Sequence, residues 1–315
     1  MNLKDGKLLR AGSYINGEWH TDDLTFDVLD PATGKSLIKV AEVTDRQLEY
    51  AIVNAKNAQI NWAAKTAKER AIVLMHWFSL IMDNQQDLAT LMTHEQGKPI
   101  RESMGEMTYA ASYIEWFAEQ GKRLYGDLIP QPSSDRRLLS IQQPIGVVSA
   151  ITPWNYPSGM ITRKAAPALA AGCSFIVKPS ELTPLSALAL AELADRAGIP
   201  AGIFNVVTGF EAERIGEVLT GHPMIRKFTF TGSTVVGKRL LAKCAATVKK
   251  TSMELGGNAA LIIFDDADLE VAVKGAIASK FRNAGQTCVS ANRIFVQNGI
   301  YDKFIEQFVE KIALL

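Results

Sequence analysis

The amino-acid sequence predicts an α/β fold in which a parallel sheet is covered by helices on both faces. From Ile145 onward, short apolar runs alternate with segments of helical spacing, a rhythm typical of parallel sheets. Polar runs follow three expected strands, at residues 152–155, 178–181 and 231–233. Ligands bind at the carboxyl ends of such strands, so this clustering predicts a binding site. The expected strands are residues 145–151, 174–177, 203–207, 227–231, 247–254, 260–264 and 293–297.

The first third of the chain is predicted to be helical. Thr44-x-x-Gln47 and Thr66-x-x-Glu69 match the capping box that opens an amphipathic helix. The pattern that follows Thr66 ends at Gly97-Lys98-Pro99. A further helix is expected over about residues 101–119, with four aromatic side chains on one side of it: Tyr109, Tyr113, Trp116 and Phe117.

Residues 124–144 are expected to form an extended hairpin. Two apolar runs, 124–130 and 137–142, flank a polar break of Pro, Ser, Asp and Arg. A hairpin of this kind can reach away from the body of the protein as an arm.

Composition narrows the class of protein. The chain has 315 residues, is 47% hydrophobic and carries a formal charge of +1, which suits a globular protein of about two domains and gives no reason to expect a nucleic-acid or membrane partner. No apolar stretch is long enough to span a bilayer, and the N-terminus lacks the apolar core of a signal peptide. Three cysteines without CxxC spacing favour a reducing, cytoplasmic setting and argue against structural zinc. Cys173 and Cys244 fit core positions.

Three short runs carry side chains suited to carbonyl chemistry. Cys288 ends the run Asn-Ala-Gly-Gln-Thr-Cys, Glu254 lies in Met-Glu-Leu-Gly-Gly-Asn, and Asn155 lies in Thr-Pro-Trp-Asn-Tyr-Pro. A thiol can attack a carbonyl carbon, a carboxylate can act as a base, and an amide can hold an oxyanion. Taken singly, each has a plainer alternative: a buried small hydrophobe, a surface carboxylate and a turn residue.

A second set of residues suits a dinucleotide. Lys178 closes a strand, where it can reach ribose hydroxyls or can simply be a solvated lysine. Glu181 can accept hydrogen bonds from the adenine ribose, and its charge favours NAD over NADP. Gly232 and Ser233 open a glycine-containing loop before a helix, a setting that suits a pyrophosphate, although the GxGxxG fingerprint is absent.

All three runs in this order, with Lys178-Pro179 between them, closely resemble the aldehyde dehydrogenase superfamily. The resemblance covers essentially the whole chain and is strongest over residues 145–297. It implies that Cys288 is the nucleophile, Glu254 the general base and Asn155 the oxyanion donor. It also implies a set of cofactor contacts: Trp154, Asn155, Lys178, Glu181, Gly232, Ser233 and Leu255.

The resemblance also implies a domain plan. Residues 1–123 and 145–253 match an NAD(P)-binding domain, residues 124–144 match part of an oligomerisation arm, and residues 254–315 match the start of a catalytic domain. Family members are dimers or tetramers and need no metal, so we expect a homodimer or homotetramer with NAD, or alternatively NADP, as cofactor. Relatives carry a second cysteine two residues after the nucleophile in some cases; Ser290 occupies that position here.

Within the superfamily the chain is most similar to the succinate-semialdehyde dehydrogenases of bacterial GABA degradation. The runs that carry this similarity are residues 113–117, 160–164 and 279–283. Arg163 and Arg282 match arginines that grip the far carboxylate of the substrate, and a guanidinium binds a carboxylate bidentately. Both can instead be surface arginines. Glutarate semialdehyde, one methylene longer, suits the same pair.

Besides an active dehydrogenase, two other interpretations of the sequence remain open: a non-catalytic fragment and a cysteine hydrolase. The chain ends on an amphipathic segment, residues 301–315, without a polar tail, and we expect it to be a truncated piece of a longer enzyme. It would then be either a remnant of an active dehydrogenase or a non-catalytic fragment that binds a dinucleotide. A cysteine hydrolase is a third reading, and it would require a histidine beside Cys288. All four histidines lie outside the three runs.

Overall fold

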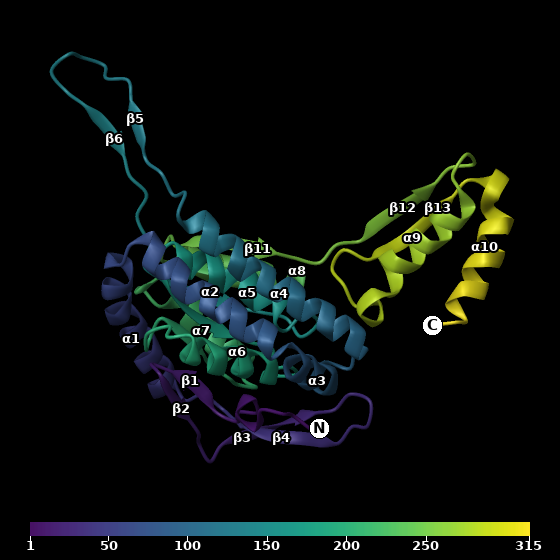
Figure 1. Ribbon diagram of the computed structural model, residues 1–315, viewed down its shortest axis with the longest axis horizontal. Coiled ribbons are helices and arrows are strands. Elements are labelled where there is room, and N and C mark those ends of the chain that lie inside the picture. Colours follow the sequence, from purple (N-terminus) through teal and green to yellow (C-terminus); the bar gives the residue numbers. More distant parts are fainter. The chain divides into compact units, whose positions relative to one another are not determined.

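The computed structural model describes residues 1–315, which divide into two units, Met1–Glu254 and Leu255–Leu315. Each unit is described by itself. The first is built on a seven-stranded sheet of order β11-β10-β7-β8-β9-β1-β2 (Figure 1). The five strands from β11 to β9 in this order run parallel to one another: β7 (Val147–Ile151), β8 (Ser174–Lys178), β9 (Phe204–Val206), β10 (Ile225–Thr231) and β11 (Lys250–Glu254).

The strands of this sheet after residue 145 are parallel as expected, and two antiparallel strands from the start of the chain extend it, which corrects the expectation of a helical first third. Residues 13–41 hold four strands, and β1 pairs antiparallel with β9. Asn16 and Gly17 both have positive φ and connect β1 to β2, so the Asn-Gly dipeptide was the hairpin signal in the sequence. The four strands are β1 (Ser13–Ile15), β2 (Glu18–His20), β3 (Thr25–Leu29) and β4 (Ser36–Ala41), and a 3-10 turn, η1 (Gly6–Leu8), precedes them.

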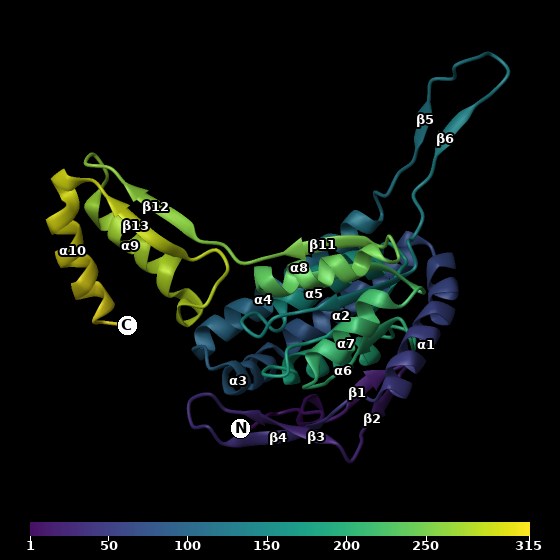
Figure 2. The same ribbon diagram turned by 180° about the vertical axis from the view of Figure 1, so that it is seen from behind.

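Helices follow the parallel strands in alternation. They are α5 (Gly159–Ala170), α6 (Leu185–Arg196), α7 (Ala212–Gly221) and α8 (Thr234–Ala245). The strand order moves one way from β7 to β9 and the other way from β7 to β11. Because such crossovers are right-handed, α5 and α6 cover one face of the sheet and α7 and α8 the other. Figure 2, seen from behind, has α8 in front.

The capping boxes at Thr44 and Thr66 are both confirmed. They open α1 (Asp45–Ala64), which contacts β7, β8 and β9, and α2 (Ala67–Asp83). Asn84 separates α2 from α3 (Gln85–Gln96), and Gly97, in the left-handed conformation, ends α3 as expected. The long helix α4 (Ile100–Gly121) packs on α2, α3 and α5 as a second layer (Figure 1).

Between α4 and β7 the chain forms the expected hairpin, from β5 (Asp127–Ile129) and β6 (Leu138–Ser140). Its apolar side chains lie in solvent: Leu128 is 72% exposed and Leu139 73%. Figure 1 shows the hairpin standing off the body of the first unit. Its role as an oligomerisation arm stays a prediction.

The second unit has a two-stranded parallel sheet of β12 (Ala259–Ile263) and β13 (Ala291–Val296). These strands pack on α9 (Leu269–Phe281) and α10 (Asn298–Ile312), and α10 confirms the helix expected near the end of the chain. A short turn, η2 (Arg282–Gly285), follows α9. The hydrophobic core of the second unit is small and consists of Ile263, Val273, Ala276, Ile300 and Phe304.

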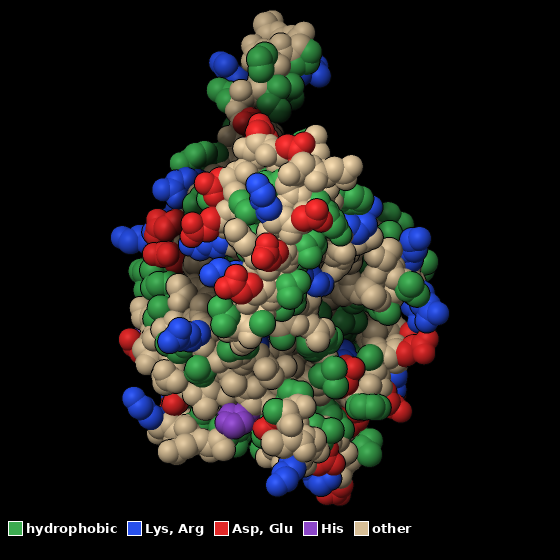
Figure 3. Space-filling view, turned by 90° about the vertical axis from the view of Figure 1, so that its right-hand side faces the viewer, with side chains coloured by type: hydrophobic (Ala, Val, Ile, Leu, Met, Phe, Trp, Pro, Cys, Tyr) green, Lys and Arg blue, Asp and Glu red, His purple; other side chains and the backbone are tan.

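Two global properties agree with the composition. None of the helices combines the length and the apolar character that crossing a membrane requires. On the face drawn in Figure 3, acidic and basic side chains are interspersed, in keeping with the formal charge of +1.

Candidate active site

The carboxyl edge of the sheet in the first unit collects the polar runs that the sequence singled out. Ile151 at the end of β7 pairs with Lys178 of β8 on one side and with Phe230 of β10 on the other. Thr231 of β10 pairs with Glu254, the last residue of β11. The chain segments that carry Asn155, Lys178, Ser233 and Glu254 therefore leave the sheet from four neighbouring strands at one edge.

Lys178 is held in an ion pair at this edge. Its Nζ donates to Glu181 Oε2 at 3.0 Å and to the carbonyl oxygen of Pro179 at 3.1 Å. The side chain is only 1% exposed, so the alternative of a solvated lysine is wrong. Burial lowers the pKa of Lys178, and the nearby Glu181 carboxylate opposes that shift. A buried ammonium group beside a part-exposed carboxylate offers both a donor and an acceptor to a polyhydroxy ligand.

The N-termini of the four helices after these strands are capped in two different ways. Carboxylates from distant parts of the chain cap α5, α6 and α7: Glu106, Glu95 and Glu42 each accept two backbone N–H groups there. The N-cap of α8 is its own Ser233, whose hydroxyl accepts from Val236 N. A carboxyl group that accepts these N–H groups occupies the place of an anionic ligand, so α8 is the helix whose N-terminus suits a phosphate.

Gly232 precedes that cap and has a packing reason of its own. A Cβ atom at this position would lie 2.4 Å from the ring of Phe230, which is closer than carbon atoms approach. Glycine therefore lets the backbone fold over the Phe230 ring at the start of the loop. The sequence predicted a loop that suits a pyrophosphate, which stays a prediction; the contact that the structure describes for Gly232 is with Phe230.

Glu254 is exposed at the end of β11, and the structure adds a cation near it that the sequence reasoning missed. Lys164, in α5, is buried and donates to Thr229 Oγ1 at 3.0 Å. Burial and, to a lesser extent, the charge of Arg163 lower the pKa of Lys164 to about 8, against an opposing effect of the Glu254 carboxylate. Nothing in the local pattern of α5 distinguishes this lysine, because its partners lie far along the chain.

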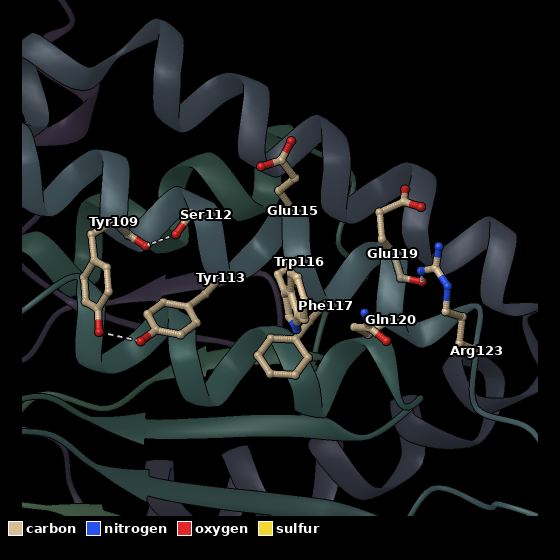
Figure 4. A pocket seen from close by; sticks show the side chains of 9 residues that line it. All are labelled: Tyr109, Ser112, Tyr113, Glu115, Trp116, Phe117, Glu119, Gln120 and Arg123. Carbon is tan, nitrogen blue, oxygen red and sulfur yellow. Dashed lines mark hydrogen bonds between the residues drawn. The ribbon is translucent and has the colours of Figure 1, made fainter.

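Arg163 lies beside an aromatic surface on α4. Its guanidinium carbon is 5.7 Å from the centroid of the Tyr113 ring, and the hydroxyl groups of Tyr109 and Tyr113 share a hydrogen bond. Both tyrosines line a pocket together with Trp116 and Phe117 (Figure 4). The aromatic side predicted for this helix is confirmed. An arginine beside such a pocket is placed to meet an anionic end of a small organic molecule.

In the second unit, Cys288 lies in the loop between η2 and β13 and is exposed, whereas Cys173 and Cys244 are buried as predicted. A Cβ atom on Gly257 would lie 3.4 Å from the carbonyl oxygen of Cys288, so the Gly-Gly run passes close to the thiol loop. Arg282 is exposed at the end of α9. The approach of this loop to residues of the first unit stays a prediction.

The loop that carries the thiol begins with an unusual backbone. Asn283, Ala284 and Gly285 all have positive φ, at 55°, 53° and 76°. The left-handed conformation costs about 1–2 kcal/mol for a residue that has a Cβ atom. Asn283 Nδ2 donates to the carbonyl oxygen of Gln286 at 3.1 Å, which ties this turn together just before Cys288.

These features fit one class of protein, and comparison with known proteins assigns it. The chain belongs to the aldehyde dehydrogenase family, whose model matches residues 19–315. The family and the fold expected from the sequence are thereby confirmed.

Among curated proteins, it is 59% identical over 309 residues to a 3-sulfolactaldehyde dehydrogenase of Pseudomonas putida, covering 98% of this chain and 63% of that protein. It is 57% identical over 317 residues to the succinate-semialdehyde dehydrogenase [NADP(+)] of Escherichia coli (strain K12), with 100% and 66% covered. It is 56% identical over 317 residues to a glutarate-semialdehyde dehydrogenase of Pseudomonas putida, again with 100% and 66% covered. The chain thus spans about two thirds of the length of these relatives.

A crystal structure of succinate-semialdehyde dehydrogenase from Burkholderia pseudomallei superposes with a TM-score of 0.98 at 53% identity, covering 100% of this chain and 66% of that one. Relatives with three different substrate names are about equally similar, so the family assignment leaves the particular aldehyde open.

Proposed function

We propose that the protein oxidises an aldehyde with a distal acidic group to the corresponding acid, with succinate semialdehyde as the first candidate and a nicotinamide cofactor as hydride acceptor. The observation that carries this proposal is the carboxyl edge of the first unit, where Asn155, Lys178 with Glu181, Ser233 and Glu254 leave neighbouring strands. A role in GABA degradation, a cytoplasmic location and assembly into dimers or tetramers belong to the same proposal.

The proposed reaction begins at Cys288. Its thiolate adds to the aldehyde carbon, and the carbonyl oxygen becomes an oxyanion that accepts a hydrogen bond from the Asn155 amide. A nicotinamide, when bound, would supply the acceptor for the hydride of this adduct. Glu254 then takes a proton from water, the water oxygen adds to the Cys288 thioester, and the acid leaves as the thiolate is restored. An exposed thiol and an exposed carboxylate suit these roles, since both must meet a substrate.

The residues at the sheet edge fit a dinucleotide. Lys178 and Glu181 would hold the adenine ribose, and the N-terminus of α8 with Ser233 would hold the pyrophosphate. Trp154, Gly232 and Leu255 complete the proposed cofactor contacts. The Glu181 carboxylate favours NAD, because a 2′-phosphate would meet its negative charge. One relative is named as an NADP(+) enzyme, so NADP is the alternative, and the ion pair with Lys178 offsets part of that repulsion.

Arg163 and Arg282 would bind the far end of the substrate. Succinate and glutarate semialdehyde carry a carboxylate and 3-sulfolactaldehyde a sulfonate, so the named relatives share an anion at a distance from the aldehyde. Arg163 beside the Tyr113 ring suits such an anion. Substrates that differ by one methylene differ by only about 1–3 kcal/mol in binding, so glutarate semialdehyde is the second candidate.

The test compares three aldehydes: succinate semialdehyde, glutarate semialdehyde and uncharged butanal, each with NAD and with NADP. We expect reduced cofactor to form with the two acidic aldehydes and much less with butanal, and no turnover by Cys288→Ser. Replacing Arg282 with alanine should lower kcat/KM for the acidic aldehydes while leaving that for butanal unchanged. Equal loss for all three aldehydes would refute the arginine assignment, and undiminished turnover by Cys288→Ser would refute the mechanism.

A further inference from the structure

A buried ion pair that the proposed mechanism does not use lies directly under the Asn155 turn. Lys98 Nζ contacts Glu106 Oε2, and both side chains are 1% exposed. Lys98 follows the glycine that ends α3, and Glu106 lies inside α4. Burial lowers the pKa of Lys98 and raises that of Glu106, and the charge of each partner opposes the shift of the other.

The pair holds the second half of the turn between β7 and α5, from Asn155 to the start of the helix. At the first end, Lys98 Nζ donates to the carbonyl oxygen of Asn155 at 2.8 Å and lies 4.3 Å from the centroid of the Tyr156 ring. At the second end, Glu106 Oε1 accepts from Ser158 N at 3.0 Å and from the N–H of the following glycine at 3.1 Å. One carboxylate therefore links the cation beside Asn155 to the first N–H groups of α5.

Stability alone is a weak reason for such a pair. Two charges lose hydration when they are buried, and well-packed apolar side chains of similar size often serve a fold equally well. What the pair supplies is a fixed orientation, through three hydrogen bonds and one cation–π contact to residues 155–159. Both partners are themselves fixed, Glu106 by its helix and Lys98 by Pro99 after it and by a bond from its own N–H to Gln96 Oε1.

We propose that Lys98 and Glu106 are positioning residues that fix the backbone of Asn155 so that its amide stays aimed at the oxyanion. The inference rests on the proposed function. A donor must be held within about 0.5 Å of its productive position to stabilise a transition state, and the peptide carbonyl of Asn155 is the atom through which Lys98 acts. The pair touches neither Cys288 nor the proposed cofactor contacts Lys178 and Glu181.

The test uses Lys98→Met, which keeps an unbranched apolar chain and removes the donor to Asn155. The double variant Lys98→Met/Glu106→Gln removes both charges, so that no uncompensated charge is buried if the single variant folds poorly. Glu192→Gln is the matched control, because Glu192 is also a buried glutamate with cationic partners but lies in no proposed site. Two quantities are measured on each protein: amide hydrogen exchange at residues 158–160, and steady-state kinetics.

We expect exchange at residues 158–160 and kcat to change together in both Lys98 variants, with about tenfold faster exchange and about a tenfold or greater loss of kcat. Amide exchange in the rest of the first unit should stay unchanged, which a general loss of folded protein would not produce. Glu192→Gln should leave both quantities unaltered. Unchanged exchange in a folded Lys98 variant overturns the inference, and so does faster exchange with full kcat. Absence of turnover in the unmodified protein would count against the proposed function, and exchange would still decide whether the pair fixes the turn.

Discussion

The buried carboxyl of Glu95 should make the first unit less stable as the pH rises through neutrality. Glu95 is 3% exposed and has no cation bonded to it; it accepts from Leu185 N at 2.7 Å and from Ser186 N at 2.8 Å. Burial, with a smaller contribution from the charge of Glu106, raises the pKa of Glu95 to about 8, against the effect of the Ser186 hydroxyl and of these N–H groups. The folded protein therefore keeps a proton on Glu95 over a pH range in which the unfolded chain has lost it.

The magnitude follows from the two pKa values. Between the unfolded value of 4.5 and the folded value of about 8, the native state binds one more proton than the unfolded state. The free energy of unfolding then falls by about 1.4 kcal/mol per pH unit, or about 3 kcal/mol between pH 5.5 and 7.5. The stabilisation is complete below the unfolded pKa and is lost as the pH rises through the folded one. Glu95→Gln removes the titrating group and should remove this slope.

Tryptophan fluorescence during urea unfolding measures the free energy of unfolding of the first unit, in which Glu95 lies. All five tryptophans lie in Met1–Glu254, so their emission reports on that unit alone. Unfolding curves at pH 5.5, 6.5 and 7.5 should give a wild-type minus Glu95→Gln difference that shrinks by about 3 kcal/mol across the range. Parallel pH profiles for the two proteins would refute the reasoning, because they would mean that the N–H groups outweigh burial and Glu95 is ionised throughout.

Three further outcomes follow from the site. Glu181→Gln should raise kcat/KM for NADP relative to NAD, because it removes the negative charge that a 2′-phosphate would meet; an unchanged ratio would place the ribose elsewhere. Under native conditions iodoacetamide should label Cys288 and spare the two buried cysteines, which peptide mass mapping can check; labelling of a buried thiol first would contradict the described burial. Gly232→Ala should lower the free energy of unfolding by about 1–3 kcal/mol through the clash with Phe230, whereas Gly105→Ala, where a Cβ atom meets nothing within 4 Å, should not; equal effects in urea unfolding would exclude the clash.

The parts of the fold that the sequence predicted are those set by local chemistry. The capping boxes at Thr44 and Thr66 act within four residues, and the β-α-β alternation after Ile145 reflects burial on both faces of a sheet. The strands before residue 42 were missed although Asn16-Gly17 is a hairpin signal, because three-residue strands such as Ser13–Ile15 are too short to show a period of two. Whether β1 joins the large sheet is decided by its pairing with β9, nearly 200 residues away in sequence.

The residues of the candidate site also divide into those that local sequence predicted and those that only the fold revealed. The ends of β8 and β10 identified Lys178 and Ser233, because polar residues after apolar strands are visible in the sequence. Lys98 and Lys164 were not visible, since nothing next to them shows that they are buried: their partners Asn155 and Thr229 lie 57 and 65 residues away. Whether a lysine is buried depends on residues distant in the sequence, so the residues next to it do not predict its burial.

The glutamate caps of the three helices have a consequence for the order in which the chain is made. Glu42, Glu95 and Glu106 all precede the helices that they cap, which begin at residues 159, 185 and 212. A ribosome therefore releases each carboxylate before the N–H groups that need it, and a helix can be capped as soon as it emerges. A gene split after residue 121 would remove that advantage: the later half would carry three helix starts without the carboxyl groups that cap them, and it should fold only when the earlier half is supplied to it.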